Sequence, residues 1–187
     1  LTSFSTEVIS ILLFFINLLL PIRMFLSLIK VTIPSPGTDL KDVISNTYYL
    51  SNQIIDRYEK NSFGINFNYI KEDKLSGTAG GVKKCQFFFD EGEDFIVMSG
   101  DVLTNVDIKK GIEQHKKSGA IATIGIKEVE HSKVSHFGVV VTDNSGFITE
   151  FQEKPDVSVA KSNFINTGIY IFNYKIFDYI PENTFYD

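Results

Sequence analysis

The side chain of Asp101 stands directly after an apolar run, Phe95-Ile-Val-Met-Ser-Gly100. This pattern is typical of a buried strand that delivers one carboxylate to the edge of a sheet. Ligands of open parallel α/β sheets bind outside the carboxyl ends of the strands, and Mg²⁺ favours one or two carboxylates together with substrate phosphate oxygens. Gly100 and Asp101 are therefore candidates for a metal and phosphate site. A simple turn after a buried strand is the alternative interpretation.

A second candidate is the glycine-rich stretch Leu75-Ser-Gly-Thr-Ala-Gly-Gly81, which precedes a predicted helix. Glycine lets a backbone approach a ligand closely, and the N-terminus of a helix favours anions. The stretch contains Gly77, Thr78 and Ala79, and it could bind an anionic ligand. The alternative interpretation is a flexible loop without a ligand.

Two further polar clusters adjoin predicted strands. Glu153-Lys154-Pro155 follows a strand directly, so that a carboxylate and an ammonium group stand side by side. Glu153 could accept hydrogen bonds from hydroxyl groups while Lys154 binds a phosphate as a point charge; an exposed charged turn is the alternative. Asn166 and Thr167 open another strand and could bond a polar ligand, unless they cap a turn of their own backbone.

Composition argues against several other kinds of site. The net charge of −5 over 187 residues disfavours a nucleic-acid partner bound through a basic face. Cys85 is the single cysteine, which excludes an internal disulfide, and we expect it to be a buried thiol in a reducing compartment. His115, His131 and His136 lack the spacing of metal ligands. We expect His115 to lie on the inward face of a helix.

The elements that would position these residues alternate along the chain from Asp39 onward. Helices are predicted at 49–58, 80–88, 107–118 and 174–180, and strands at 43–46, 65–70, 95–99, 120–126, 138–142, 147–152 and 168–172. A turn at 143–146 joins two of these strands as a hairpin. The alternation predicts an α/β fold, Rossmann-like and layered, with a mainly parallel mixed sheet. The strand 95–99 is expected to be central, buried and parallel, with Asp101 in a cleft near Glu153, Lys154 and Asn166.

Residues 1–38 differ from the rest of the chain. The segment 8–29 is nearly all Leu, Ile and Phe, interrupted by Asn17, Pro21 and Arg23, and its length fits a bilayer span of roughly 20 residues. A signal peptide is not expected, because no basic region precedes the apolar run. We predict two parts: an apolar segment and linker at 1–38, which is either a membrane anchor or not native to the fold, and an α/β domain at 39–187.

Short motifs follow one another in order along the second part. They are Asn46-Thr-Tyr-Tyr-Leu-Ser-Asn-Gln-Ile54, Gly77-Thr-Ala-Gly80, Ser99-Gly-Asp101, His136-Phe-Gly-Val-Val140, Phe151-Gln-Glu-Lys-Pro155 and Asn166-Thr-Gly-Ile-Tyr170. In this order and spacing they resemble the sugar-nucleotidyltransferase family, the nucleoside-diphosphate-sugar pyrophosphorylases. Residues 39–187 would then be a partial nucleotidyltransferase domain. The motif at 77–80 looks most like the corresponding motif of mannose-1-phosphate guanylyltransferases, which use GTP.

The resemblance implies that a sugar 1-phosphate is joined to the α-phosphorus of a nucleoside triphosphate, with release of pyrophosphate and with GDP-mannose as a candidate product. The nucleophile is already an anionic oxygen, so catalysis would consist mostly of positioning and charge neutralisation. By resemblance, Asp101 would hold Mg²⁺ and Lys154 would neutralise the sugar phosphate. The substrate-binding residues would be Gly77 and Thr78 at the nucleotide, together with Ala79 and Gly100, and Gly138, Glu153, Asn166 and Thr167 at the sugar.

The chain also departs from the pattern of the family. The family begins with a strand and a glycine-rich loop that grips the triphosphate, whereas this chain has no Gly before Gly37 and stops before a second metal-binding Asp. We therefore expect weak or no activity from this chain. A non-catalytic or membrane-tethered sugar-nucleotide-binding homologue and a metal-dependent glycosyltransferase are the alternatives.

The apolar segment also sets the expected location of the protein. We expect a cytoplasmic protein, associated with the membrane if 8–29 is a genuine span. The sequence leaves open whether the chain forms a homo-oligomer. Residues 1–38 are expected either to pack as a helix against an exposed face of the sheet or to make the chain insoluble without detergent.

Overall fold

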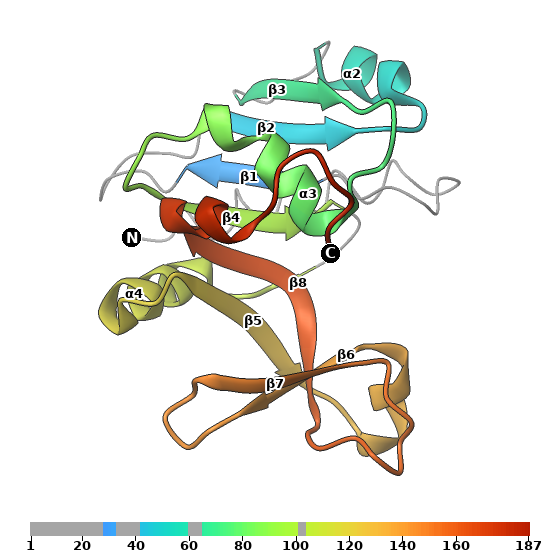
Figure 1. Cartoon of the computed structure of the whole chain (residues 1–187), viewed down its shortest axis with the longest axis vertical. Helices are drawn as coiled ribbons and strands as arrows, with labels where there is room; N and C mark the ends of the chain where they lie inside the picture. The colour runs from blue at the N-terminus through green and yellow to red at the C-terminus, as the bar shows by residue number, and fades with distance from the viewer. Residues whose placement is uncertain (1–27, 33–41, 60–64, 101–103) are drawn as a thin grey trace. The chain divides into compact units, whose positions relative to one another are not determined.

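A computed structural model describes residues 28–32, 42–59, 65–100 and 104–187, and of residues 28–32 it describes the backbone alone. The chain divides into two compact units (Figure 1). Unit 1 consists of Leu1–Thr123 and Tyr170–Asp187, and unit 2 of Ile124–Ile169. Strands and helices alternate along the chain, as the sequence predicts.

Unit 1 is built on a sheet whose hydrogen-bonded strand order is β3-β2-β1-β4-β8. Its strands are β1 (Leu28–Thr32), β2 (Asp42–Thr47), β3 (Asn66–Lys71), β4 (Asp94–Ser99) and the last part of β8 (Phe164–Asn173). The apolar run that precedes Asp101 forms β4, and Phe95 through Met98 are at most 3% exposed. The prediction of a central, buried strand is therefore confirmed.

The predicted direction of β4 needs a correction. β4 pairs antiparallel with β1, with Met98 opposite Ile29. β1 is also antiparallel to β2, and β2 is parallel to β3. The strands β2, β3 and β4 therefore share one direction, and β1 lies between β2 and β4 in the opposite direction. The expected parallel alignment is wrong for the β1–β2 and β1–β4 pairs, because a strand that the sequence analysis did not predict, β1, lies between β2 and β4.

β1 falls in the segment for which the sequence predicted an apolar span and a linker. β-branched residues occur at Ile29, Val31 and Thr32, and such residues favour strands. The expected helical packing is therefore wrong for 28–32. Residues 1–27 and 33–41 lie outside the described part of the chain, so the membrane span at 8–29 stays a prediction. Within the described ranges, no helix has the length and apolar character needed to cross a membrane.

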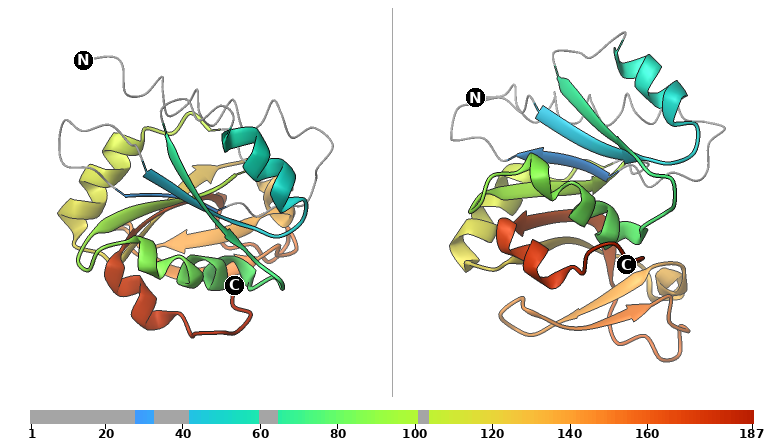
Figure 2. Two further views of the ribbon diagram at one scale, coloured as in Figure 1. Left: turned by 90° about the horizontal axis from the view of Figure 1, so that it is seen from above. Right: turned by 45° about the horizontal axis from the view of Figure 1, so that its top comes forward.

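The helical elements of unit 1 are α2 (Ser51–Glu59), α3 (Gly77–Lys84), η1 (Gln86–Phe88), α4 (Ile108–Ser118) and η3 (Tyr174–Tyr179). α4 begins after Asp107, whose carboxylate accepts a hydrogen bond from the Lys110 amide, and ends at Gly119 with φ of 63°. Both ends agree with the sequence, because an Asp cap and a left-handed Gly are common helix boundaries. In Figures 1 and 2, α3 and η3 lie on the same face of the sheet.

The core of unit 1 lies between the sheet and the helices α3 and η3. Its buried members are Ile44, Val82, Cys85, Phe89, Phe95, Val97, Phe177 and Ile180. The ring of Phe95 stacks on Phe89 with centroids 4.2 Å apart and on Phe177 at 5.3 Å. Burying a side chain of this size contributes about 1.5–3 kcal/mol, so this aromatic stack joins β4 to the segments before and after it. Cys85 is a buried free thiol, as predicted.

Unit 2 contains a β-hairpin and the strands that support it. Its elements are β5 (Ala122–Glu128) from residue 124 onward, η2 (His131–His136), β6 (Gly138–Thr142), β7 (Ile148–Glu153) and the first part of β8. β6 is antiparallel to β7 and to β8. The predicted turn is present: the Asp143 carboxylate accepts hydrogen bonds from the amides of Ser145 and Phe147. The hairpin brings Gly138 opposite Glu153.

Candidate functional site

The predicted nucleotide residues form the first turn of α3, which we call the glycine turn (residues 76–80). Gly77 has φ of 78°, a left-handed conformation that favours glycine. A Cβ at Gly77 would lie 2.4 Å from the carbonyl oxygen of Tyr186. Ala79 packs, partly buried, against the core, so its methyl group has a structural role. The glycine is therefore required by local conformation and by the close approach of the C-terminal segment.

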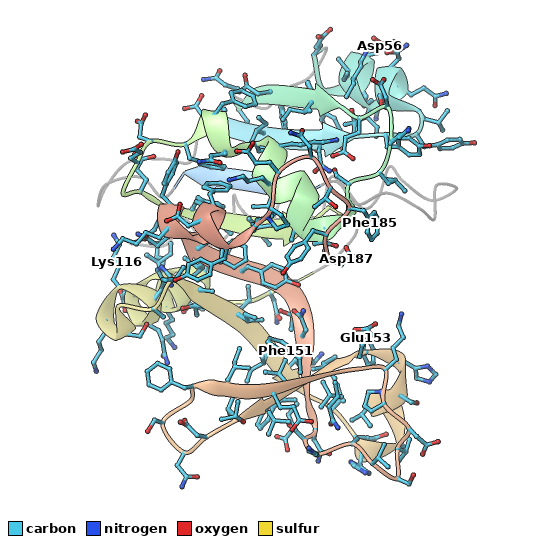
Figure 3. All side chains as sticks on the ribbon, viewed as in Figure 1. Asp56, Lys116, Phe151, Glu153, Phe185 and Asp187 are labelled. Atoms are coloured by element: carbon cyan, nitrogen blue, oxygen red, sulfur yellow. The ribbon has the colours of Figure 1, made fainter. Side chains whose placement is uncertain are left out.

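That C-terminal segment, residues 184–187, bonds directly to the glycine turn. The amide of Thr78 donates a hydrogen bond to Asp187 Oδ1 at 2.6 Å. The amide of Gly80 donates to Tyr186 O, and the amide of Tyr186 donates to Ser76 O, each at 2.9 Å. Figure 3 labels Phe185 and Asp187 on this segment. Two N–H groups of the helix N-terminus, which the sequence offered to an anionic ligand, are thus used inside the chain.

On its other side the glycine turn is held by Glu72, which the sequence analysis did not single out. The Glu72 side chain is 1% exposed. Its carboxylate accepts hydrogen bonds from Ser76 Oγ at 2.8 Å, from the Ser76 amide at 3.3 Å and from Asn46 Nδ2 at 3.3 Å. Lys84 Nζ lies 3.8 Å from Glu72 Oε1. A buried carboxylate needs such partners, so Glu72 fixes the turn to β2 and α3.

The predicted sugar residues meet in unit 2. Gly138 and Glu153 face each other across β6 and β7. A Cβ at Gly138 would lie 3.3 Å from Glu153 Oε2 and 3.9 Å from Asn166 Cβ. The structure therefore brings Gly138, Glu153 and Asn166 together, although they are far apart in the sequence. A Cβ at position 138 would come close to the tip of the exposed Glu153 side chain, so the glycine leaves room beside this carboxylate.

Lys154 adopts an uncommon backbone conformation next to this cluster. Its φ is 42°, in a region that costs non-glycine residues energy and that is often found at functional sites. The backbone is held there because the Lys154 amide donates a hydrogen bond to Phe137 O at 3.1 Å. Lys154 Nζ lies 3.3 Å from Glu153 Oε1, and the side chains are 65% and 75% exposed. Both charged groups are thus open to a ligand from solvent.

Asn166 and Thr167 have structural partners. Asn166 Oδ1 accepts a hydrogen bond from the Gly168 amide at 2.9 Å, which is the backbone-capping turn that the sequence offered as the alternative. Thr167 Oγ1 donates to Gly125 O at 2.6 Å. The Thr167 hydroxyl proton is therefore used within the fold, and Thr167 could meet a ligand only as an acceptor.

Asp101 lies outside the described residues, so its predicted cleft stays a prediction. Gly100, immediately before it, is buried at the end of β4. In the described ranges, no group of three or more His, Cys, Asp or Glu side chains is arranged to hold a metal ion.

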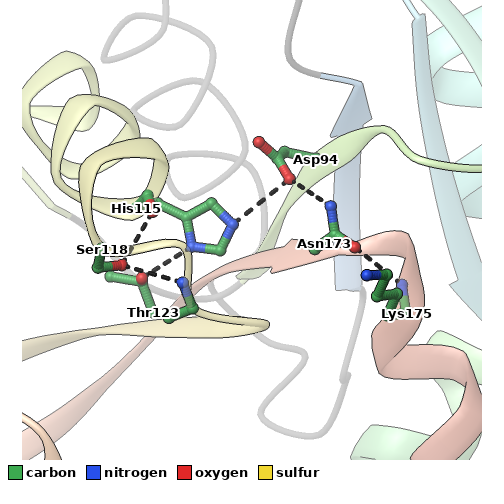
Figure 4. Close-up of polar contacts among 7 residues, drawn as sticks. Asp94, His115, Ser118, Thr123, Asn173 and Lys175 are labelled. Atoms are coloured by element: carbon green, nitrogen blue, oxygen red, sulfur yellow. Dashed lines mark hydrogen bonds and ion pairs between the residues drawn. The ribbon is translucent and has the colours of Figure 1, made fainter.

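His115 belongs to a buried polar network that its helix position alone did not reveal (Figure 4). Its side chain is 2% exposed. Nδ1 lies 2.8 Å from Thr123 Oγ1, and Nε2 lies 3.5 Å from Asp94 Oδ1, which also accepts a hydrogen bond from Asn173 Nδ2 at 2.9 Å. The network joins α4 to β4, β5 and β8. Because the imidazole is buried, we assign it a structural role, and the predicted inward orientation of His115 is confirmed.

Comparison with known proteins identifies the family to which this chain is related. Residues 21–185 match the family model described as nucleotidyl transferase. The chain is 41% identical over 156 residues to the UTP–glucose-1-phosphate uridylyltransferase of Synechocystis sp.. It is 37% identical over 137 residues to the mannose-1-phosphate guanylyltransferase catalytic subunit beta of Dictyostelium discoideum. These matches cover 78% and 72% of this chain but 40% and 37% of the relatives, so the chain spans less than half of their length.

Solved structures show the same fold. HddC from Yersinia pseudotuberculosis is similar with a TM-score of 0.66 at 27% identity, covering 78% of this chain and 61% of that chain. A second structure of HddC is a complex with GMP-PN. A UDP-glucose pyrophosphorylase complexed with UDP-glucose has a TM-score of 0.62 at 19% identity, covering 75% of this chain and 61% of that chain, and shows likeness of fold. The predicted α/β class is confirmed.

Proposed function

We propose, from the premise that this chain belongs to the nucleotidyl transferase family, that it binds a sugar 1-phosphate and a nucleoside triphosphate for the synthesis of a nucleoside-diphosphate sugar. A phosphate oxygen of the sugar phosphate bonds to the α-phosphorus, the bond from that phosphorus to the β-phosphate oxygen breaks, and pyrophosphate leaves. Because the attacking oxygen is already an anion, the protein has to align it and neutralise charge rather than remove a proton.

The observation that carries this proposal is the cluster of Gly138, Glu153 and Asn166 with Lys154 beside it. The Glu153 carboxylate can accept hydrogen bonds from sugar hydroxyls, and the exposed Lys154 ammonium can pair with a phosphate. The left-handed backbone at Lys154 supports a functional role, because such strain persists where the surrounding structure holds it. Gly138 keeps the space between these groups open to a ligand.

Mg²⁺ is the proposed metal, with Asp101 as its ligand from the protein. Asp101 follows Gly100 at the carboxyl end of β4, and a carboxylate oxygen is a donor that Mg²⁺ prefers. When bound, the ion would neutralise charge on the phosphate oxygens. The glycine turn is the proposed nucleotide-binding element, through the Gly77 backbone and the Thr78 side chain, since the Thr78 amide is already bound to Asp187.

GDP-mannose is the finer proposal for the product. It is supported by the Gly77-Thr-Ala-Gly80 motif and by the Dictyostelium relative. The Synechocystis relative is a UTP–glucose-1-phosphate uridylyltransferase, so UTP and glucose 1-phosphate are the alternative substrate pair. Since the family match is to nucleotidyltransferases, the glycosyltransferase alternative has no support. The cytoplasmic location stays a prediction, and the oligomeric state stays open.

The test is calorimetric titration of the chain with mannose 1-phosphate, glucose 1-phosphate, GTP and UTP, each with Mg²⁺ present. Lys154→Ala should weaken binding of the preferred sugar 1-phosphate about tenfold, since a hydrogen bond to a charged group contributes roughly 1.5–3 kcal/mol. The matched control is Lys161→Ala, because Lys161 is also exposed in unit 2 and its ammonium pairs with Glu150 at 2.7 Å.

Equal effects of the two lysine variants would contradict the assignment of Lys154. We also expect the triphosphates to bind more weakly than the sugar phosphate. Release of pyrophosphate from the substrate pairs measures turnover, which we expect to be weak. Normal turnover together with micromolar GTP binding would overturn that expectation.

A further inference from the structure

The C-terminal residues 184–187 are joined to α3 by more than one kind of contact. Two backbone hydrogen bonds connect Tyr186 with Ser76 and Gly80, and the Asp187 carboxylate accepts from the Thr78 amide. Further along α3, Lys83 Nζ donates to Phe177 O at 2.8 Å. The C-terminal part of unit 1 therefore follows the whole length of α3, and it is bonded most closely to the glycine turn.

The glycine turn is thus held between two carboxylates from distant parts of the sequence. Glu72 binds the side chain and amide of Ser76 from the buried side. Asp187 accepts a hydrogen bond from the Thr78 amide, two residues further along the chain, from the other side. The left-handed Gly77 lies between these two anchors. A backbone turn fixed at both ends keeps its remaining groups in one orientation, which lowers the ordering cost of binding a ligand.

We infer that residues 184–187 act as a strap that positions the glycine turn for the nucleotide, and that Asp187 is a positioning residue within it. Asp187 acts through Thr78 and needs no contact with the nucleotide. This inference rests on the proposed function, since it takes the glycine turn as the nucleotide-binding element. It adds to that function a residue that none of the sequence motifs contains.

The strap itself is tested without any substrate. Amide hydrogen exchange of Thr78 in the full chain should speed up about tenfold or more in Asp187→Ala, because its acceptor is removed. Asp187→Asn keeps an oxygen acceptor and should retain most of the protection. The matched control is Asp178→Ala, at an exposed Asp of η3 that lies outside residues 184–187, which should leave the exchange of the Thr78 amide unchanged. Unchanged exchange in Asp187→Ala would overturn the inference.

The effect on the nucleotide is tested by titration with GTP and with UTP in the presence of Mg²⁺. Asp187→Ala should lower the affinity for the better-binding triphosphate about three- to tenfold, because the released turn must then be ordered when the ligand binds. The affinity for mannose 1-phosphate should stay unchanged, which separates positioning from general loss of structure. Asp187→Asn should restore most of the affinity. Equal losses for both ligands, or a higher triphosphate affinity in Asp187→Ala because the Thr78 amide is freed, would overturn the positioning role.

Amide chemical shifts distinguish failure of the strap from failure of the proposed function. If the triphosphate shifts the amides of residues 77–79 in the unaltered chain, the nucleotide is at the glycine turn. Unchanged affinity in Asp187→Ala would then overturn the strap alone. If these amides do not shift while the triphosphate binds, the proposed nucleotide site is wrong, and the strap inference fails with it.

Discussion

Glu72 in unit 1 and Glu153 in unit 2 both stand at the carboxyl end of a strand, but their surroundings differ. The Glu72 side chain is 1% exposed and accepts hydrogen bonds from Asn46 and Ser76. The Glu153 side chain is 75% exposed, with Lys154 Nζ 3.3 Å away. The same local pattern therefore gives a structural carboxylate in one unit and an accessible one in the other. Burial by distant segments, rather than position in the strand, decides which carboxylates can meet a ligand.

The largest expected effect is that of Gly77→Ala, which we expect to lower the free energy of unfolding by about 3 kcal/mol. The new Cβ would lie 2.4 Å from Tyr186 O, and φ is 78°. The control is Gly92→Ala, which has φ of 86° and nothing within 4 Å of the added Cβ, and which should cost about 1–2 kcal/mol. Urea unfolding measures both. Equal losses would show that the strap does not enclose the glycine turn.

Removing the two carboxylates tests the comparison directly. Glu72→Ala should cost about 2 kcal/mol, because the Ser76 and Asn46 donors lose a buried acceptor. Glu153→Ala should change the free energy of unfolding by less than about 0.5 kcal/mol, as is usual for an exposed side chain. Glu72→Gln keeps one oxygen acceptor and should lie between them. A larger cost for Glu153→Ala than for Glu72→Ala would contradict the contrast.

At Lys154, stability should depend on which residue is substituted, whereas the loss of binding should not. Lys154→Gly should be more stable than Lys154→Ala by about 1 kcal/mol, since glycine tolerates the left-handed conformation, while both variants lose affinity for the sugar 1-phosphate. At Lys161, which is not among the residues with positive φ, Gly should instead be less stable than Ala. Thermal unfolding of the four variants measures this. The same order at both positions would remove the evidence for strain at Lys154.

The smallest effect concerns Tyr69, whose buried hydroxyl has no hydrogen-bond partner in the described part of the chain. Tyr69→Phe should raise the free energy of unfolding at pH 7 by about 0.5 kcal/mol. By contrast, Tyr174→Phe should lower it by about 1 kcal/mol, because Tyr174 Oη accepts a hydrogen bond from Gln86.

The ionisation of Tyr69 adds a dependence on pH. Burial raises the pKa of Tyr69 from 10.0 to about 12, so the unfolded chain loses this proton first. The stabilisation from the neutral phenol is complete below pH 10 and is lost as the pH rises from 10 to 12. Tyr69→Phe should therefore lose less stability over that interval, as measured by unfolding at several pH values. An unchanged pH dependence would show that Tyr69 ionises normally.

Local patterns predicted much of the architecture. Asp107 and Gly119 mark the ends of α4, and the turn at 143–146 forms the expected hairpin. The apolar run of β4 is buried, and Gly77 has a positive φ of 78° that favours glycine. These features depend on residues close together in the sequence or on conformations that few residue types adopt.

Other features needed the tertiary structure. The sequence by itself determined the order of the main elements from β2 onward, the inward face of α4 and the residues of both candidate ligand regions. The folded chain decided that β1 pairs antiparallel between β2 and β4, that Glu72 is buried, and that Asp187 binds Thr78 across 109 residues of sequence. Hydrophobic periodicity reports which face of an element is buried, but it does not report which distant donor meets which acceptor, because that depends on how the elements pack.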